Sequence, residues 1–218
     1  MASVSESPAG AVVFSRKERF HNSFFRLVTD ELRLETPTSS ASSNSSTVRR
    51  DYIADHVGAV GVVAYNESAD AVMLVQQYRH PVQRELWELP AGLLDVATES
   101  ALDCARRELA EETDLTAARW DVLVDLLVSP GSSDEAIRIF LAREITALPE
   151  HQRQQRIDEE AAMLSMWVSL PTAIARVMVG EIENAACVAG LLALHSTKNA
   201  QWPPLRPAEA NWGARPHR

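Results

Sequence analysis

Residues 106–115 read RRELAEETDL and place three glutamates in the last turns of a predicted helix. Glu108, Glu111 and Glu112 stand at i, i+3 and i+4, so their side chains share one helical face. Each carboxylate there is unfavourable by roughly 0.3–1 kcal/mol, because the C-terminal end is the negative pole of the helix macrodipole. Arg107, four residues before Glu111, offsets only part of this charge. Crowded carboxylates of this kind suit a hard divalent cation; a solvated charged face is the alternative interpretation.

The composition of the 218-residue chain limits its possible partners and predicts one main domain with an appendage. It has 21 Lys and Arg against 30 Asp and Glu, a formal net charge of −9, which disfavours nucleic acid as a partner. The longest apolar run, residues 185–194, is too short to span a membrane, and the N-terminus lacks the pattern of a secretory signal. Cys104 and Cys187 provide no disulfide framework. These features favour a cytoplasmic, reduced protein.

Local patterns predict a mixed sheet flanked by helices, an α+β or α/β sandwich. The spacing of Leu102, Ala105 and Leu109 predicts a helix that begins after Thr98, as N-cap, and ends at Thr113. Strands are predicted at residues 59–65, 71–78, 86–89, 120–128 and 136–142, and further helices at 171–179 and 184–196, the second capped by Asn184.

Composition also divides the chain into regions. Residues 1–56 are predicted to form a small β region, with strand-like patterns at 24–34 and 47–55. The Ser-rich segment 39–47 lies between these patterns, and its composition suits a surface loop. The main domain is predicted for residues 57–200, followed by an irregular tail at 201–218.

The spacing around the glutamates resembles the Nudix box, whose pattern is Gly, five residues, Glu, seven residues, then Arg-Glu-aliphatic-any-Glu-Glu-any-Gly-aliphatic. In this chain Gly92 is followed by six residues, Glu99, seven residues and RELAEETDL. The extra residue precedes the helix, and Asp114, which tolerates left-handed backbone, replaces the final Gly. The resemblance covers roughly residues 49–195. It implies a Nudix α/β/α sandwich with a mixed sheet, an α+β fold.

The flanking residues are similar to those of ADP-ribose pyrophosphatases. Residues 76–95, QQYRHPVQRELWELPAGLLD, resemble the segment that enters the box in those enzymes, and Pro130 stands fifteen residues after Leu115, where they carry a marker proline. A plain turn is the alternative interpretation of Pro130. The resemblance implies hydrolysis of ADP-ribose to AMP and ribose 5-phosphate. The alternatives are another nucleoside diphosphate derivative, such as a GDP-sugar or oxidised nucleotide, and a module that binds ADP-ribose without cleaving it.

The resemblance also implies residue roles and an assembly. Mg²⁺, or Mn²⁺ as a substitute, would be bound by Glu108, Glu112 and the Ala91 carbonyl, with Glu111 joining directly or through water. Glu159 and Glu160 match loop glutamates of the family, one of them the general base, and which one is open. Substrate contacts are implied for Arg79, Arg50, Leu93 and Pro130, and structural roles for Gly92, Glu99 and Arg107, with Arg107 paired to Glu111. Close relatives form homodimers by exchanging their N-terminal β regions, so a homodimer is expected.

Overall fold

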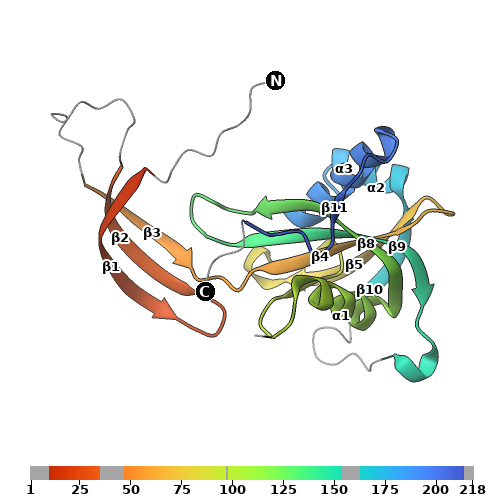
Figure 1. Cartoon of the computed structure of the whole chain (residues 1–218), viewed down its shortest axis with the longest axis horizontal. Coiled ribbons are helices and arrows are strands. Elements are labelled where there is room, and N and C mark those ends of the chain that lie inside the picture. The colour runs from red at the N-terminus through yellow and green to blue at the C-terminus, as the bar shows by residue number, and fades with distance from the viewer. Residues whose placement is uncertain (1–9, 35–46, 97, 154–162, 214–218) are drawn as a thin grey trace.

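The computed structural model describes residues 10–34, 47–96, 98–153 and 163–213. Its N-terminal part is an antiparallel three-stranded sheet, which projects from one end of a larger sheet (Figure 1). The three strands are β1 (Ala11–His21), β2 (Arg26–Leu34) and β3 (Val48–Ala54), in the order β1-β2-β3. The β structure predicted for this region is therefore present, and β1 is a strand that the sequence patterns missed.

The larger sheet is mixed and has eight strands within the described residues, in the order β10-β5-β4-β9-β8-β11, with β6 paired to β5 and β7 to β4. Its central strands β4 (Ala59–Asn66) and β9 (Ala136–Ala147) are parallel, and the other pairs are antiparallel. The remaining strands are β5 (Ala71–Arg79), β6 (Arg84–Glu88), β7 (Ala91–Leu93), β8 (Leu115–Leu127), β10 (Leu164–Ser169) and β11 (Arg206–Pro207).

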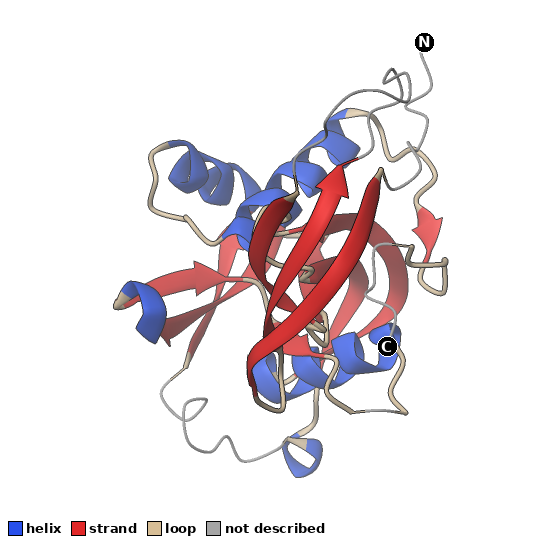
Figure 2. Ribbon diagram, turned by 90° about the vertical axis from the view of Figure 1, so that its left-hand side faces the viewer, coloured by secondary structure: helices blue, strands red, loops and turns tan. Residues whose placement is uncertain are grey.

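Helices lie on both sides of this sheet (Figure 2). One apolar cluster packs α1 (Ala101–Thr113) against one face, and a second packs α2 (Leu170–Met178) and α3 (Ala185–Asn199) against the other. Two single-turn 3₁₀ helices, η1 (His80–Val82) and η2 (Glu150–Gln152), lie in connections. None of the described helices has the length and apolar character needed to cross a membrane. The predicted α/β/α sandwich with a mixed sheet is confirmed.

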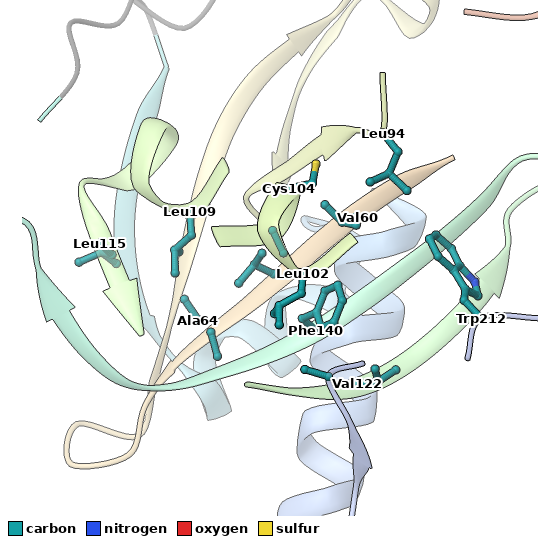
Figure 3. Packing of buried hydrophobic residues seen from close by; sticks show 14 of the residues in the cluster. Val60, Ala64, Leu94, Leu102, Cys104, Leu109, Leu115, Val122, Phe140 and Trp212 are labelled. Carbon is teal, nitrogen blue, oxygen red and sulfur yellow. The ribbon is translucent and has the colours of Figure 1, made fainter. Parts of the chain in front are cut away.

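The burial of strand β4 on both faces explains why its sequence is apolar without alternation. Val60, Val62 and Ala64 belong to the cluster beneath α1, whereas Val63 and Tyr65 belong to the cluster beneath α2 and α3. A strand covered on both faces needs apolar residues at every position. Figure 3 shows the first of these clusters, where side chains of α1, β4 and β9 meet.

Helix α1 begins two residues later than predicted. Its N-cap is Ser100, whose Oγ accepts a hydrogen bond from the Asp103 backbone N–H at 3.1 Å and donates one to the Asp103 carboxylate at 2.7 Å. This reciprocal pair of hydrogen bonds caps the first turn of the helix at Ser100, so Thr98 is not the N-cap. At the other end, Asp114 adopts a left-handed backbone with φ of 56°, and its N–H donates to the Ala110 carbonyl. The prediction that Asp114 ends the helix in place of Gly is confirmed.

Strands β8 and β9 extend beyond the predicted apolar runs. Their added length carries charged residues that pair across the ladder, such as Arg143, whose Nη2 donates to the Asp121 carboxylate at 2.8 Å. The predicted cap Asn184 is confirmed, since its side chain accepts from the Cys187 backbone N–H.

The C-terminal tail is irregular apart from β11, but its described part packs on the main domain. Trp212 is only 8% exposed and belongs to the cluster around α1. Arg138 of β9 donates to the carbonyls of Ala210 and Asn211 at 2.6 and 3.1 Å, and its guanidinium lies 5.0 Å from the Trp212 ring centroid. The sequence patterns did not predict this docking, which buries the tryptophan.

Candidate active site

Arg107 is the centre of the acidic turn. Its Nε and Nη2 donate to both carboxylate oxygens of Glu99 at 2.9 and 3.0 Å, and its Nη1 donates to Glu108 at 2.7 Å and Glu111 at 3.0 Å. The predicted pair with Glu111 is present, within a larger network. The Arg107 hydrogen bonds lower the pKa of the Glu99 carboxyl, and those with Glu99 raise the pKa of Arg107. One guanidinium thus links the loop before α1 to the carboxylate face.

Glu108 and Glu112 reach across to β7, and both are buried. The Glu112 carboxylate accepts from the Ala91 backbone N–H at 3.0 Å. A Cβ placed on Gly92 would lie 1.8 Å from Oε1 of Glu108, so only glycine leaves room for that carboxylate. Pairing of β7 with β4 holds the Ala91–Gly92 step beside the helix. The two carboxylates therefore gather at one backbone step.

A cleft of about 1110 Å³ opens beside these groups. It brings together seven of the predicted site residues: Arg79, Ala91, Gly92, Leu93, Arg107, Glu108 and Glu112. The first turn of α3 forms another part of the wall through Asn184, Ala185 and Ala186. This helix was predicted, but not its place at the site.

Other predicted residues are not brought to the cleft. Arg50 lies on β3, in the projecting sheet, where its Nη1 donates to the Arg49 carbonyl. Pro130 is in the β8–β9 turn, and this turn bonds to the end of β3 through the Ile53 N–H and the Ser132 carbonyl. Glu111 faces Arg107 and is not among the residues that line the cleft. Glu159 and Glu160 lie outside the described residues.

Arg79 makes a contact that the sequence patterns did not predict. Its Nε donates to Oε1 of Glu88 at 2.9 Å and its Nη2 to Oε2 at 2.7 Å. Both residues line the cleft, and Glu88 is buried whereas Arg79 is not. The signal that could have found Glu88 was a charge inside the apolar run LWELPAG.

The two cysteines are free and buried. Burial raises the pKa of the Cys104 thiol to about 12, and the nearby charge of Glu108 acts in the same direction. The thiol is therefore protonated at neutral pH and lies 3.5 Å from the Leu93 carbonyl, to which it can donate. It supports the loop and is not an activated nucleophile.

The acidic face has the donor chemistry of a site for a hard divalent cation. Carboxylate oxygens from one helix meet a backbone step on a neighbouring strand, and hard cations prefer oxygen ligands. In the described part of the chain, however, no three His, Cys, Asp or Glu side chains converge as a group that could hold a metal ion. The residues present fit such a cation by the chemistry of their oxygen donors, and Gly92 leaves room for the Glu108 carboxylate among them.

The fold is an α/β/α sandwich with a cleft beside its acidic turn, and comparison with known proteins gives the family. The Nudix domain model matches residues 55–184. The chain therefore belongs to the Nudix family. Nudix hydrolases generally need a divalent metal.

Individual relatives refine the comparison. The chain is 45% identical over 164 residues to an ADP-ribose pyrophosphatase of Mycobacterium tuberculosis, covering 75% of this chain and 77% of that protein. It is 36% identical over 133 residues to an ADP-ribose pyrophosphatase of Bacillus subtilis, covering 61% and 69%. A GDP-mannose pyrophosphatase of Citrobacter koseri is 30% identical over 142 residues, covering 62% and 72%. The crystal structure of an ADP compounds hydrolase superposes with a TM-score of 0.70 at 16% identity, over 91% of this chain and all of that one, which supports the fold alone.

Proposed function

We propose that this protein hydrolyses ADP-ribose to AMP and ribose 5-phosphate. The observation that carries the proposal is the meeting of Glu108 and Glu112 with the Ala91–Gly92 step in a cleft that also contains Arg79. The names of the two relatives with 45% and 36% identity support ADP-ribose as the substrate. Water adds to one phosphorus, and the bridging P–O bond of the diphosphate breaks.

The metal in this proposal is Mg²⁺, with Mn²⁺ as a substitute. Glu108, Glu112 and the Ala91 carbonyl would hold it, and Glu111 would join them directly or through water. When bound, such an ion neutralises diphosphate charge and makes a bound water more acidic. Arg79 binds a phosphate or the terminal ribose, a role suited to the planar guanidinium, and Leu93 adds an apolar contact to the substrate from the same wall.

The general base in this proposal is Glu159 or Glu160. A base on an element separate from α1 can approach after the substrate binds. Substitution of each residue by Gln separates the two roles, because loss of the base lowers kcat more than it changes KM. We expect one of the two variants to show this pattern.

The decisive experiment is product analysis after incubation with ADP-ribose and Mg²⁺. We expect AMP and ribose 5-phosphate in equal amounts, and faster cleavage than with GDP-mannose, which the name of the Citrobacter koseri relative makes the second candidate. Preference for GDP-mannose would move the proposal to that substrate. Binding of ADP-ribose without cleavage would instead indicate a non-catalytic module.

Glu112→Gln tests the role of the acidic turn in the same assay. We expect kcat to fall by at least about 100-fold, because a metal ion contributes several kcal/mol to the barrier and each 1.36 kcal/mol is tenfold. The amide oxygen can still accept from the Ala91 N–H, so the melting temperature should change little. Full activity of a folded Glu112→Gln variant would show that the turn is only structural.

We also propose that the protein is a homodimer that exchanges its N-terminal sheets. Large apolar side chains are exposed on this sheet, among them Phe14, Phe20 and Leu34. In such a dimer, Arg50 would contact substrate in the cleft of the partner. The β8–β9 turn that contains Pro130 bonds to the end of β3, so Pro130 would reach the same cleft. Light scattering measures the mass in solution, and a monomer would contradict this assembly. Loss of substrate affinity in Arg50→Ala would support the shared site.

A further inference from the structure

Glu88 is a buried carboxylate in the wall of the cleft, and the hydrolysis proposed above gives it no role. It ends β6, three residues before Ala91, and its side chain is 4% exposed. Removing an isolated charge from water is costly unless it is paired and hydrogen-bonded. The position of Glu88 therefore requires a matching cation at a defined place beside the cleft.

Arg79 supplies this cation through two parallel hydrogen bonds, at 2.9 and 2.7 Å. In the antiparallel register of β5 and β6, Glu88 lies opposite Val75 and Arg79 lies opposite Arg84. The contact is therefore made by two long side chains that meet along the hairpin. A two-point contact fixes the plane of the guanidinium as well as its position. It uses two of the five guanidinium N–H donors.

The first turn of α3 lines the same cleft as Glu88. Asn184, Ala185 and Ala186 line the cleft, and burial, together with the Glu88 charge, raises the pKa of the Cys187 thiol in that turn. The N-terminus of a helix favours negative charge nearby. Arg79 binds the Glu88 carboxylate directly, and the N-terminus of α3, which lines the same cleft, also favours negative charge there.

We propose that Glu88 is a positioning residue that holds the Arg79 guanidinium in the orientation from which it binds the diphosphate of the substrate. The proposal rests on the function proposed above, because the contact of Arg79 with substrate belongs to that function. Glu88 itself does not contact the substrate. Its contribution is to restrict a long side chain that is otherwise 43% exposed.

Glu88→Gln removes one of the two acceptors and keeps the size of the side chain. The amide nitrogen cannot accept from Arg79, so the guanidinium is held at one point. We expect the Kd for ADP, measured by calorimetry without metal, to rise about tenfold, and KM to rise with kcat changed by less than about threefold, as for loss of uniform binding.

The matched control is Glu183→Gln. Glu183 pairs with Arg84 on the same β5–β6 hairpin, but both side chains are exposed and neither lines the cleft. We expect its ADP affinity to stay within twofold of the wild type. Circular dichroism checks the fold of each variant. If Glu88→Gln does not fold, Glu88→Asp keeps the charge but shortens the reach, and should weaken ADP binding about threefold for the same reason.

A double-mutant cycle separates positioning from a general effect on the cleft. If Glu88 acts through Arg79, Arg79→Gln and the double variant should lose the same ADP affinity. ADP affinity of Glu88→Gln within twofold of the wild type, or losses that multiply in the double variant, would overturn the proposal. If the wild type binds ADP but does not cleave ADP-ribose, the proposed hydrolysis is contradicted. The ADP titrations of the variants still test the role of Glu88 in that case. A wild type that neither binds ADP nor cleaves ADP-ribose contradicts both.

Discussion

Gly92 is the residue at which the packing of the site is tightest. The carboxylate of Glu108 occupies the space where a side chain at residue 92 would begin. The requirement for glycine is thus one of space, because the backbone there belongs to strand β7. The glycine and the glutamate, sixteen positions apart in the sequence, form one unit.

Gly92→Ala should therefore damage both activity and stability. The Cβ would force Glu108 away from β7 or move the strand, and overpacking of this kind costs about 1–3 kcal/mol. We expect turnover of ADP-ribose to fall at least about tenfold because a proposed metal ligand is displaced, and the free energy of unfolding in urea to fall by this amount. Gly131→Ala is the control, since nothing lies within 4 Å of its added Cβ. Equal behaviour of the two variants would contradict the packing argument.

Among the individual site residues, the sequence predicted the acidic turn, Arg107 and Gly92, because one helix and one loop set their spacing. It did not predict Glu88. A lone charge in an apolar run gives no sign of its partner, and in the register of β5 and β6 Glu88 lies opposite Val75, not opposite Arg79. The contact depends on two long side chains that meet along the hairpin, which local patterns do not reveal.

The start of α1 shows how element boundaries are decided. Both Thr98 and Ser100 have side chains that can cap a helix, so composition alone does not choose between them. Ser100 is the cap because its hydroxyl and the Asp103 backbone and carboxylate bond reciprocally. The choice matters for function because α1 carries the acidic turn.

Ser100→Ala should therefore cost about 1 kcal/mol of the free energy of unfolding, the usual loss for an N-cap. Thr98→Ala should cost less than about 0.5 kcal/mol, as expected for a surface position. Urea denaturation followed by circular dichroism measures both variants. A larger loss in Thr98→Ala than in Ser100→Ala would show that the helix begins earlier.

The N-terminal sheet contains a polar cluster with a predictable pH response. Arg16 donates two hydrogen bonds to Asp30 at 2.9 Å, and Tyr52 donates a third at 2.8 Å. The hydrogen bonds from Arg16, followed by that from Tyr52, lower the pKa of the Asp30 carboxyl, although burial opposes them. Because the folded pKa is below the ordinary value of 3.8, this stabilisation is present above that value and is lost as the pH falls through the folded pKa.

Asp30→Asn tests this response. At pH 7 we expect the variant to be less stable by about 1–3 kcal/mol, as for a lost hydrogen bond to a charged group. The difference from the wild type should persist down to about pH 5 and shrink below about pH 4, where the Asp30 carboxyl of the unfolded wild type begins to be protonated. Denaturant unfolding at pH 7, 5 and 3 measures it. A constant difference over this range would contradict the assignment.

Across the whole molecule, the mixed sheet flanked by helices was predicted from the sequence, and the structure covers the apolar β4 on both faces. The order of the strands was not predicted. The path of the tail did not follow from the sequence either, since prolines and polar residues predict irregular chain and say nothing of where it docks. Trp212 belongs to the cluster of β4 and α1 and lies 3.9 Å from the Cβ position of Gly58, at the start of the main sheet. The end of the described chain thus packs against its middle.

Trp212→Ala should therefore destabilise the whole main domain. Deleting a buried Trp side chain typically costs about 3–5 kcal/mol, and Arg138 would lose the ring it stacks on while keeping the two hydrogen bonds that it donates to Asp125. The control is Trp167→Ala on the edge strand β10, where the residue is 38% exposed, and we expect a loss of less than about 1 kcal/mol. Urea unfolding, followed by circular dichroism because both variants change the fluorescence, measures the free energies. If the two variants lose equal stability, the tail is an appendage and not part of the core.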